Sequence, residues 1–235
     1  MNTNRVNSLF LFIFIFSFFC YGQDNLVTID LKKGEAFDIL FLTTREGTQD
    51  LFKEYRKTAF PVATEMGFSP IPGFKIRETV QGNYEPQSLI LAKWTNLSLR
   101  EKFLAEIEGR VPNFHEMRKK IWSLFNLTYY EIQQEQTIQL DREKVIVATA
   151  YWKKENMQDD FANFLTQLKK VIKKTNGTLK IELVNGRSPK GYVYNPDYMV
   201  ITQWETKKEF DAFQKKSLKM GFDFLKKVNQ FRLTD

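Results

Sequence analysis

Hydrophobic positions in the second half of the chain recur with two different periods, which predict alternating strands and helices. The β-branched and aromatic run over residues 145–152 predicts a strand. Apolar residues between Phe161 and Ile172 then recur at helical spacing, and Asn176-Gly177 provides a stop for that helix. Residues 179–183 alternate between apolar and polar positions, as a half-buried strand does.

The remaining elements of both halves follow the same plan. Residues 198–204 predict a strand, the apolar positions over 210–228 fall close to one helical face, and residues 231–234 predict a short final strand. In the first half, the same criteria predict strands over 37–43, 74–80, 88–94 and 125–132 and helices over 49–65 and 99–120. Each half therefore has the predicted order strand, helix, strand, strand, helix, strand.

The two halves match each other at an offset of 109–110 residues, which indicates an internal duplication. The clearest match joins Tyr84-x-Pro86 and an apolar strand ending at Trp94 to Tyr194-x-Pro196 and a strand ending at Trp204. Other matches occur in the same order: Thr28-Ile29 with Thr137-Ile138, Gln49-Asp50 with Gln158-Asp159, Gly67 with Gly177, Phe103 with Phe213, and Phe114 with Phe224. We predict two repeats, residues 23–134 and 135–235, each with a leading strand.

The order of elements in each repeat is typical of a ferredoxin-like βαββαβ unit, an antiparallel sheet with both helices on one face. The other face of each sheet also carries large apolar residues and must be covered. Two units in one chain can cover these faces by packing sheet to sheet. The sequence therefore predicts an α+β fold of two tandem ferredoxin-like units.

The framework of Tyr-x-Pro, an apolar strand, a tryptophan and a helix that begins with charged residues resembles the dimeric α+β barrel superfamily. The segment from Trp204 to Phe213 carries the similarity most clearly, and the framework extends over both repeats. The resemblance implies an intramolecular dimeric α+β barrel, in which the two repeats pair within one chain. It implies a shape rather than a reaction, because the matched residues are structural.

Two enzyme groups of this superfamily suggest candidate chemistry. Haem-degrading monooxygenases use an asparagine on the first strand, and a histidine and a tryptophan on the second helix. Here the predicted first strands lack asparagine, Phe103 or Phe213 takes the tryptophan-like place, and only His115 could be a ligand. We interpret His115 as a residue on the flank of a helix, and we expect no haem, metal or other cofactor.

Cofactor-free monooxygenases of the superfamily hold an aromatic substrate in the barrel cavity. By that resemblance, the candidate lining residues are Tyr84, Trp94, Tyr194 and Trp204. Paired aromatic residues at matching positions are, however, more typical of a core that defines the fold. We therefore predict non-catalytic binding of a small apolar or aromatic ligand, or of a partner protein. The alternative is a cofactor-independent monooxygenase, or a haem-degrading relative, that uses the barrel cavity.

Single polar residues add little to this picture. Asp38 interrupts an apolar strand, and we expect it to face solvent at a sheet edge rather than to act in catalysis. No glycine-rich phosphate loop, nucleophile elbow or metalloprotease helix is present in the sequence. The function therefore has to be argued from a binding site rather than from a motif.

The N-terminus has the pattern of a cleavable export signal over residues 1–22. Arg5 precedes an apolar run over residues 9–19, which is shorter than the ~20 residues that a membrane-spanning helix needs. Gly22 is a small residue before a cleavage site at Gln23, whereas lipid attachment at Cys20 and an uncleaved anchor are the alternatives. We expect an exported protein, periplasmic or extracellular, with no membrane-spanning segment in the mature chain. Because Cys20 is the only cysteine, the mature chain has no disulfide and no thiolate metal site.

Positive charge is concentrated in the second repeat. Residues 23–142 contain 16 basic and 17 acidic residues, whereas residues 143–235 contain 18 and 11. Lysine clusters such as Lys169, Lys170 and Lys173 could attract an anionic surface. No aromatic residues interleave with them as stacking on nucleic acid requires, so we interpret them as solvated helix faces and expect no nucleic-acid partner.

Overall fold

The structure is a computed structural model that describes residues 25–189, 191–192 and 194–234. The predicted export signal and Cys20 lie outside these residues. Across the described part of the chain, no helix combines the length and the apolar character needed to cross a membrane.

The first repeat forms an antiparallel four-stranded sheet covered on one face by helices. Its elements are β2 (Ala36–Thr44), α1 (Gln49–Glu65), β3 (Phe68–Gln81), β4 (Ser88–Trp94), α2 (Leu97–Arg110), α3 (Phe114–Ile121) and β5 (Trp122–Glu131). The strands lie in the order β5-β2-β4-β3. This is the order of a ferredoxin-like unit, in which the first and third strands of the unit lie in the centre.

The second repeat has the same topology. Its elements are β7 (Val145–Lys153), α4 (Gln158–Lys174), β8 (Thr178–Val184), β9 (Tyr198–Trp204), α5 (Lys207–Ser217) and β10 (Leu225–Thr234). The strand order β10-β7-β9-β8 repeats that of the first unit. The predicted fold class, two tandem ferredoxin-like units in one α+β chain, is confirmed.

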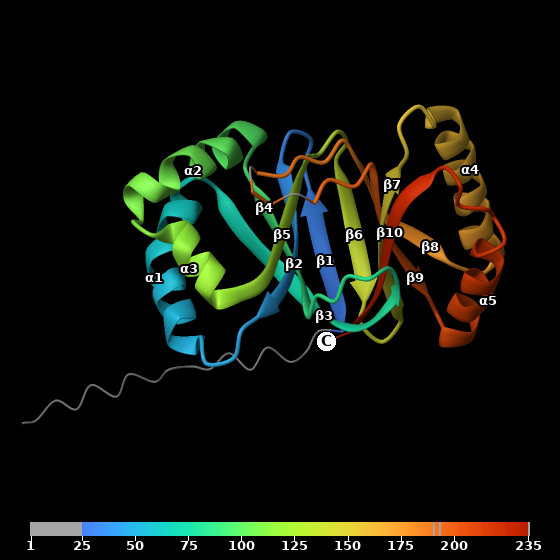
Figure 1. Ribbon diagram of the computed structural model, residues 1–235, viewed down its shortest axis with the longest axis horizontal. Helices are drawn as coiled ribbons and strands as arrows, with labels where there is room; N and C mark the ends of the chain where they lie inside the picture. Colours follow the sequence, from blue (N-terminus) through green and yellow to red (C-terminus); the bar gives the residue numbers. More distant parts are fainter. Residues whose placement is uncertain (1–24, 190, 193, 235) are drawn as a thin grey trace, which may run out of the picture.

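The two sheets join into a single eight-stranded sheet that closes on itself. β3 pairs antiparallel with β10 at one junction. At the other, Tyr129 of β5 forms an antiparallel bridge with Arg187, which follows β8. Gly186 lies so close to β5 at this junction that a Cβ atom would come within 2.6 Å of the Tyr130 ring. Helices α1, α2 and α3 lie outside the barrel on one side and α4 and α5 on the other (Figure 1).

The inner face of this sheet encloses a core of buried apolar side chains, which we call the barrel core. Phe37, Ile39 and Phe41 of β2 point into it, because alternate residues of a strand face opposite sides. The leading strands β1 (Leu26–Leu31) and β6 (Gln136–Asp141) pair with each other antiparallel and add apolar side chains to the same core. The outer face of the sheet packs against the helices in two further clusters, one for each repeat.

Two predicted helices are wrong in extent. The helix expected over 99–120 is two helices, α2 and α3, because Pro112 disfavours helical geometry at Val111 and Asn113 has a φ of 65°. The helix expected over 210–228 ends at Ser217. Gly221 has a φ of 75°, and the apolar positions beyond it belong to the turn and to β10.

Candidate functional site

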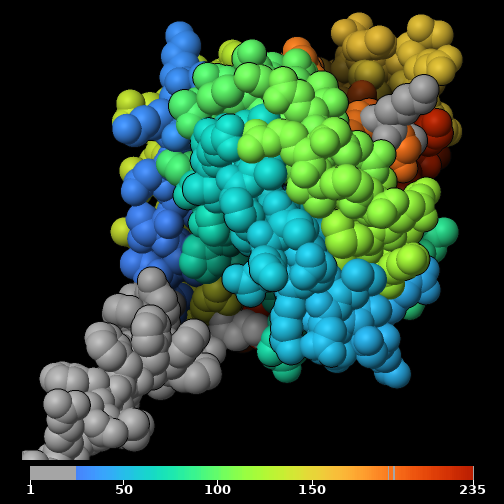
Figure 2. Space-filling view, turned by 90° about the vertical axis from the view of Figure 1, so that its left-hand side faces the viewer, coloured from blue at the N-terminus to red at the C-terminus, as the bar shows by residue number. Residues whose placement is uncertain are grey.

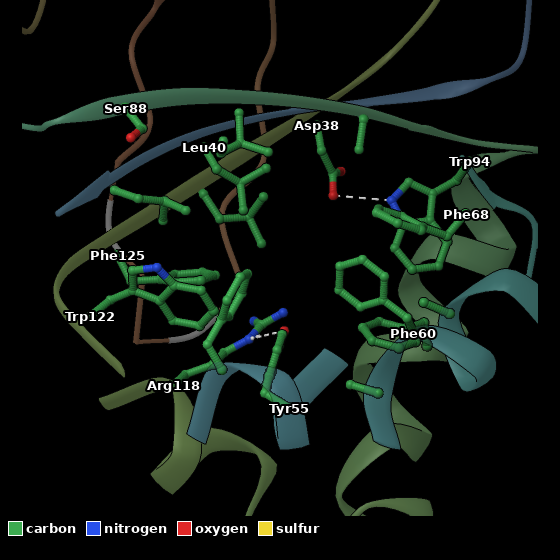
Figure 3. A pocket seen from close by; sticks show the side chains of 18 of the residues that line it. Asp38, Leu40, Tyr55, Phe60, Phe68, Ser88, Trp94, Arg118, Trp122 and Phe125 are labelled. Carbon is green, nitrogen blue, oxygen red and sulfur yellow. Dashed lines mark hydrogen bonds between the residues drawn. The ribbon is translucent and has the colours of Figure 1, made fainter. Parts of the chain in front are cut away.

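A cavity of ≈ 240 Å³ lies between the outer face of the first repeat's sheet and its helices. Figure 2 looks onto the helical layer that covers this side of the molecule, and Figure 3 shows the cavity beneath it. The sequence-based hypothesis placed a cavity in the barrel interior, whereas this one lies on the helix side of the sheet. Its lining is mostly aromatic and aliphatic, with few polar groups.

Strand periodicity brings the sheet residues of the site to one face. Asp38, Leu40 and Leu42 of β2 line the cavity, whereas the residues between them face the barrel core. Ser88, Ile90, Ala92 and Trp94 of β4 line it in the same way. Because β2 and β4 pair with Asp38 opposite Ala92, the two rows form one continuous floor.

An ion pair is buried at one end of the cavity. Arg100 Nε on α2 donates to both carboxylate oxygens of Asp38, at 2.9 and 3.0 Å, and the two residues are 1% and 3% exposed. Trp94 Nε1 donates to Asp38 Oδ2 at 3.0 Å (Figure 3). The expectation that Asp38 faces solvent at a sheet edge is therefore wrong. Its strand is central, and the polar side chain is tolerated there because it is paired.

A second guanidinium group, that of Arg118 on α3, lies at the other end of the cavity. Arg118 is 6% exposed, and its Nε donates to the Tyr55 hydroxyl at 3.0 Å (Figure 3). Its guanidinium carbon lies 4.1 Å from the centre of the Phe114 ring and 4.5 Å from that of Phe125. Within the described residues, Arg118 Nη1 has no hydrogen-bond partner, and no carboxylate forms an ion pair with this side chain. Burial alone would lower the pKa of Arg118, but its interactions with the hydroxyls of Tyr55 and Tyr192 raise that pKa above the ordinary value, so the group stays charged.

In the second repeat, larger side chains stand at the positions that border this cavity in the first. The small residues Ala59, Ala63 and Ser88 correspond to Leu168, Ile172 and Tyr198, which are all buried in the helix-side core of the second repeat. The ion pair is also absent there, since Val147 and Phe210 stand at the positions of Asp38 and Arg100. The first repeat therefore differs from its copy in both the volume and the charge of this site.

The four aromatic residues singled out in the sequence lie in three different places. Trp94 lines the cavity. Tyr84 and Tyr194 stack on each other at the barrel core, with ring centroids 5.6 Å apart, and burial raises the pKa of Tyr84 to about 12. Trp204 is 1% exposed and packs against Phe210 and Phe213 in the second repeat. These residues therefore do not form one site.

His115 lies near the cavity without lining it. Its Nδ1 is 3.0 Å from the hydroxyl of Tyr192, in the loop between β8 and β9. Burial and then the charge of Arg118 lower the pKa of His115 from its ordinary value. The ring is half-buried and engaged by a residue of the other repeat, so it is neither a free surface group nor a group directed at a ligand.

The residues of the cavity do not fit a haem group. No histidine, methionine or cysteine stands among the described residues that line it. Its one tyrosine, Tyr55, stacks on Phe114 and accepts a hydrogen bond from Arg118, so its oxygen is not free to bind iron. No group of three acidic, histidine or cysteine side chains in the described part of the chain could hold a metal ion.

Sequence reasoning missed Arg100 and Arg118, although one signal for Arg100 was present. When the two repeats are aligned in sequence, the charged residues Asp38 and Arg100 of the first correspond to the apolar residues Val147 and Phe210 of the second. Such a difference between copies of one fold indicates a site that only one copy has. Arg118 had no such signal, because residues 218–224 of the second repeat form a turn in place of α3.

Comparisons with solved structures support the fold. An anthrone oxidase-like protein superposes with a TM-score of 0.52 and 15% identity, over 88% of this chain and 94% of that one. A mutant chlorite dismutase from Candidatus Nitrospira defluvii gives a TM-score of 0.51 and 6% identity, over 87% and 93%. No protein-family model and no curated protein matches the sequence. At these identities the similarity shows the fold alone, and that fold is the dimeric α+β barrel, built here from two repeats of one chain.

Proposed function

We propose that this protein binds a small apolar or aromatic ligand in the cavity of its first repeat. The observation that carries the proposal is the contrast between the two repeats. Ala59, Ala63 and Ser88 leave space where the second repeat has Leu168, Ile172 and Tyr198. Close packing is the normal state of a protein interior, and unfilled volume reduces stability, so a retained cavity indicates a use.

The size and lining of the cavity suit a ligand of one or two rings. An engineered apolar cavity of about 150 Å³ in another protein binds benzene, and this cavity measures ≈ 240 Å³. Aromatic side chains surround it, among them Phe60, Phe68 and Trp122, and a few polar groups lie at its ends. Ligand sites usually combine an apolar wall with a few fixed polar groups. A concave apolar site of this size favours a small molecule over a partner protein.

The polar groups favour binding without catalysis. Asp38 is the only acidic residue among the described residues of the lining, and Arg100 and Trp94 occupy both of its oxygens. A general base must reach a substrate proton, and this carboxylate is already engaged. His115 contacts Tyr192 and stands outside the lining.

Filling the cavity with the side chains of the second repeat tests this function. In the variant Ala59→Leu/Ala63→Ile, the two residues take the identities of Leu168 and Ile172. Isothermal titration calorimetry with 2-naphthamide should show binding to the wild type and a loss of at least tenfold in the variant. Ala105→Leu, on the exposed face of α2, is the matched control and should bind as the wild type does. Equal binding by the filled variant would contradict the proposal.

A second candidate is cofactor-independent oxidation of an aromatic ligand in the same cavity. The observation in its favour is the buried positive charge of Arg118, which would stabilise a phenolate or enolate in an apolar site. An oxygen electrode distinguishes the two functions. Consumption of dissolved oxygen by the wild type with 1-naphthol, and its loss in Ala59→Leu/Ala63→Ile, would favour the oxygenase.

Export completes the proposal. The charge and apolar run of residues 1–22 support a cleaved signal and a periplasmic or extracellular location. The mass of the protein secreted by a host cell tests this directly, since cleavage before Gln23 predicts a chain of residues 23–235. Retention of a lipid-modified Cys20 would favour membrane anchoring instead.

A further inference from the structure

We propose that the ligand of this cavity is an apolar molecule with a carboxylate group, and that Arg118 binds that carboxylate. The inference rests on the proposed function, because it specifies the chemistry of the molecule held in the same cavity. Arg100 Nη1 and Arg118 Nη1 are both buried without a hydrogen-bond partner among the described residues, and of these two side chains only Arg118 also lacks a carboxylate counter-charge.

The cavity holds one positive charge that no carboxylate among the described residues balances. Two guanidinium groups line it, and Asp38 neutralises that of Arg100. Arg118, at the other end, interacts within the described part of the chain only with neutral groups, namely the hydroxyls of Tyr55 and Tyr192 and nearby aromatic rings. Removing a cation from water without a counter-charge is unfavourable by several kcal/mol. A bound anion would supply the missing charge.

The aromatic rings around Arg118 stabilise its charge but leave the hydrogen-bonding capacity of Nη1 unused. Phe114 and Phe125 lie against the guanidinium and interact with the cation through their faces. Neither ring offers an oxygen to Nη1, which lacks any partner among the described residues. Figure 3 shows this guanidinium directed from α3 toward the centre of the cavity. A carboxylate oxygen is the acceptor that a guanidinium binds best, because charge and planar geometry both match.

The ligand must also have an apolar body. Most of the remaining lining consists of apolar side chains of β2, β4 and α1, such as Leu40, Ile90 and Phe60. A free inorganic anion would leave these surfaces without a partner. An aromatic carboxylate would place its ring against them while its charged group reaches Arg118.

The absence of this cation from the second repeat agrees with a specific role. Residues 218–224 form a turn there, so no helix carries an arginine to the corresponding place. The helix-side core of the second repeat is apolar, with Phe164 at the position of Tyr55. The fold therefore forms without this charge, and a structural role common to both repeats does not explain it.

The test compares two ligands that differ only in charge. Isothermal titration calorimetry of the wild type at neutral pH should show 2-naphthoate binding about tenfold to a hundredfold more tightly than 2-naphthamide, the range expected for a hydrogen bond to a charged group. Arg118→Met keeps an unbranched apolar side chain and should bind the two probes with equal affinity. Arg118→Lys should retain part of the preference, because it keeps the charge and loses the planar fork.

The matched control is Arg110→Met. Arg110 lies at the end of α2 and binds Glu65 at the surface, so this variant should keep the full preference for 2-naphthoate. Equal binding of both probes by the wild type would overturn this inference and leave the proposed function standing. Binding of neither probe would refute the proposed function itself. A preference that persists in Arg118→Met would exclude Arg118 as the binding group, and the wild-type comparison remains decisive if that variant does not fold.

Discussion

The ion pair between Asp38 and Arg100 gives the sharpest prediction about stability. Both side chains are almost fully buried, and Arg100 Nε donates to both oxygens of the carboxylate. In Asp38→Val, the guanidinium of Arg100 stays buried and loses its counter-charge. Trp94 Nε1 loses its acceptor as well. The variant thus leaves two buried donors without partners.

The expected loss follows from these contacts. Removing one partner of a buried ion pair costs about 3–5 kcal/mol, and an orphaned neutral donor adds about 1–3 kcal/mol. Domains are stable by about 5–15 kcal/mol, so Asp38→Val should stand close to unfolding. The double variant Asp38→Val/Arg100→Phe introduces the apolar pair that the second repeat has at Val147 and Phe210. It should regain most of the loss, because apolar replacements of a whole buried pair are often neutral or stabilising.

Equilibrium unfolding in urea measures both variants against the wild type, with tryptophan fluorescence and far-ultraviolet circular dichroism as independent probes. Arg100→Phe alone completes the cycle and gives the coupling between the two residues. A loss of less than about 1 kcal/mol in Asp38→Val would contradict the buried-pair prediction. A double variant that is no more stable than Asp38→Val alone would contradict it equally.

Two further predictions concern packing and pH. A Cβ at Gly177 would lie 2.5 Å from Trp204 Nε1, so Gly177→Ala should reduce the free energy of unfolding by about 1–3 kcal/mol in a urea titration. Gly109→Ala, where nothing lies within 4 Å, should instead raise it by about 0.5–1 kcal/mol, and equal effects would contradict the packing argument. Burial, with the charge of Arg118, lowers the pKa of His115 below its ordinary 6.5. The unfolded chain then binds more protons than the folded state as pH falls below about 6.5, so folding loses stability there. His115→Gln should therefore lose less stability than the wild type between about pH 7.5 and 5, and parallel pH profiles would contradict this.

Much of the fold could be predicted because it follows from periodicity and repetition. The helix over 49–65 and the strands over 88–94 and 198–204 agree with the observed bounds. Each has a single hydrophobic period and clear breaks at both ends. The prediction failed where helical and strand spacing overlap, as it did after Ser217, since a few apolar residues at intervals of three or four do not distinguish a helix from a turn followed by a strand.

The site was harder to predict for two reasons. It depends on small side chains that leave space unfilled, and it brings together residues that are far apart in the sequence. Ala59 and Ala63 satisfy the same apolar pattern as Leu168 and Ile172, so periodicity does not reveal a cavity. Arg118 reaches the cavity only because α3 separates from α2. The hydrophobic spacing over 99–120 predicted one helix, and Pro112, which marks the break, was not used. Aromatic content led instead to Tyr84, Tyr194 and Trp204, which lie elsewhere, whereas Trp94 was the one candidate that lines the cavity.

A crystal structure of residues 23–235 soaked with 2-naphthoate tests the assigned ligand site most directly. We expect electron density for the ring system between α1 and the outer face of β2 and β4. We also expect a carboxylate oxygen within about 3 Å of Arg118 Nη1. Density in the second repeat or the barrel core, or an empty first-repeat cavity at saturating 2-naphthoate, would contradict this assignment.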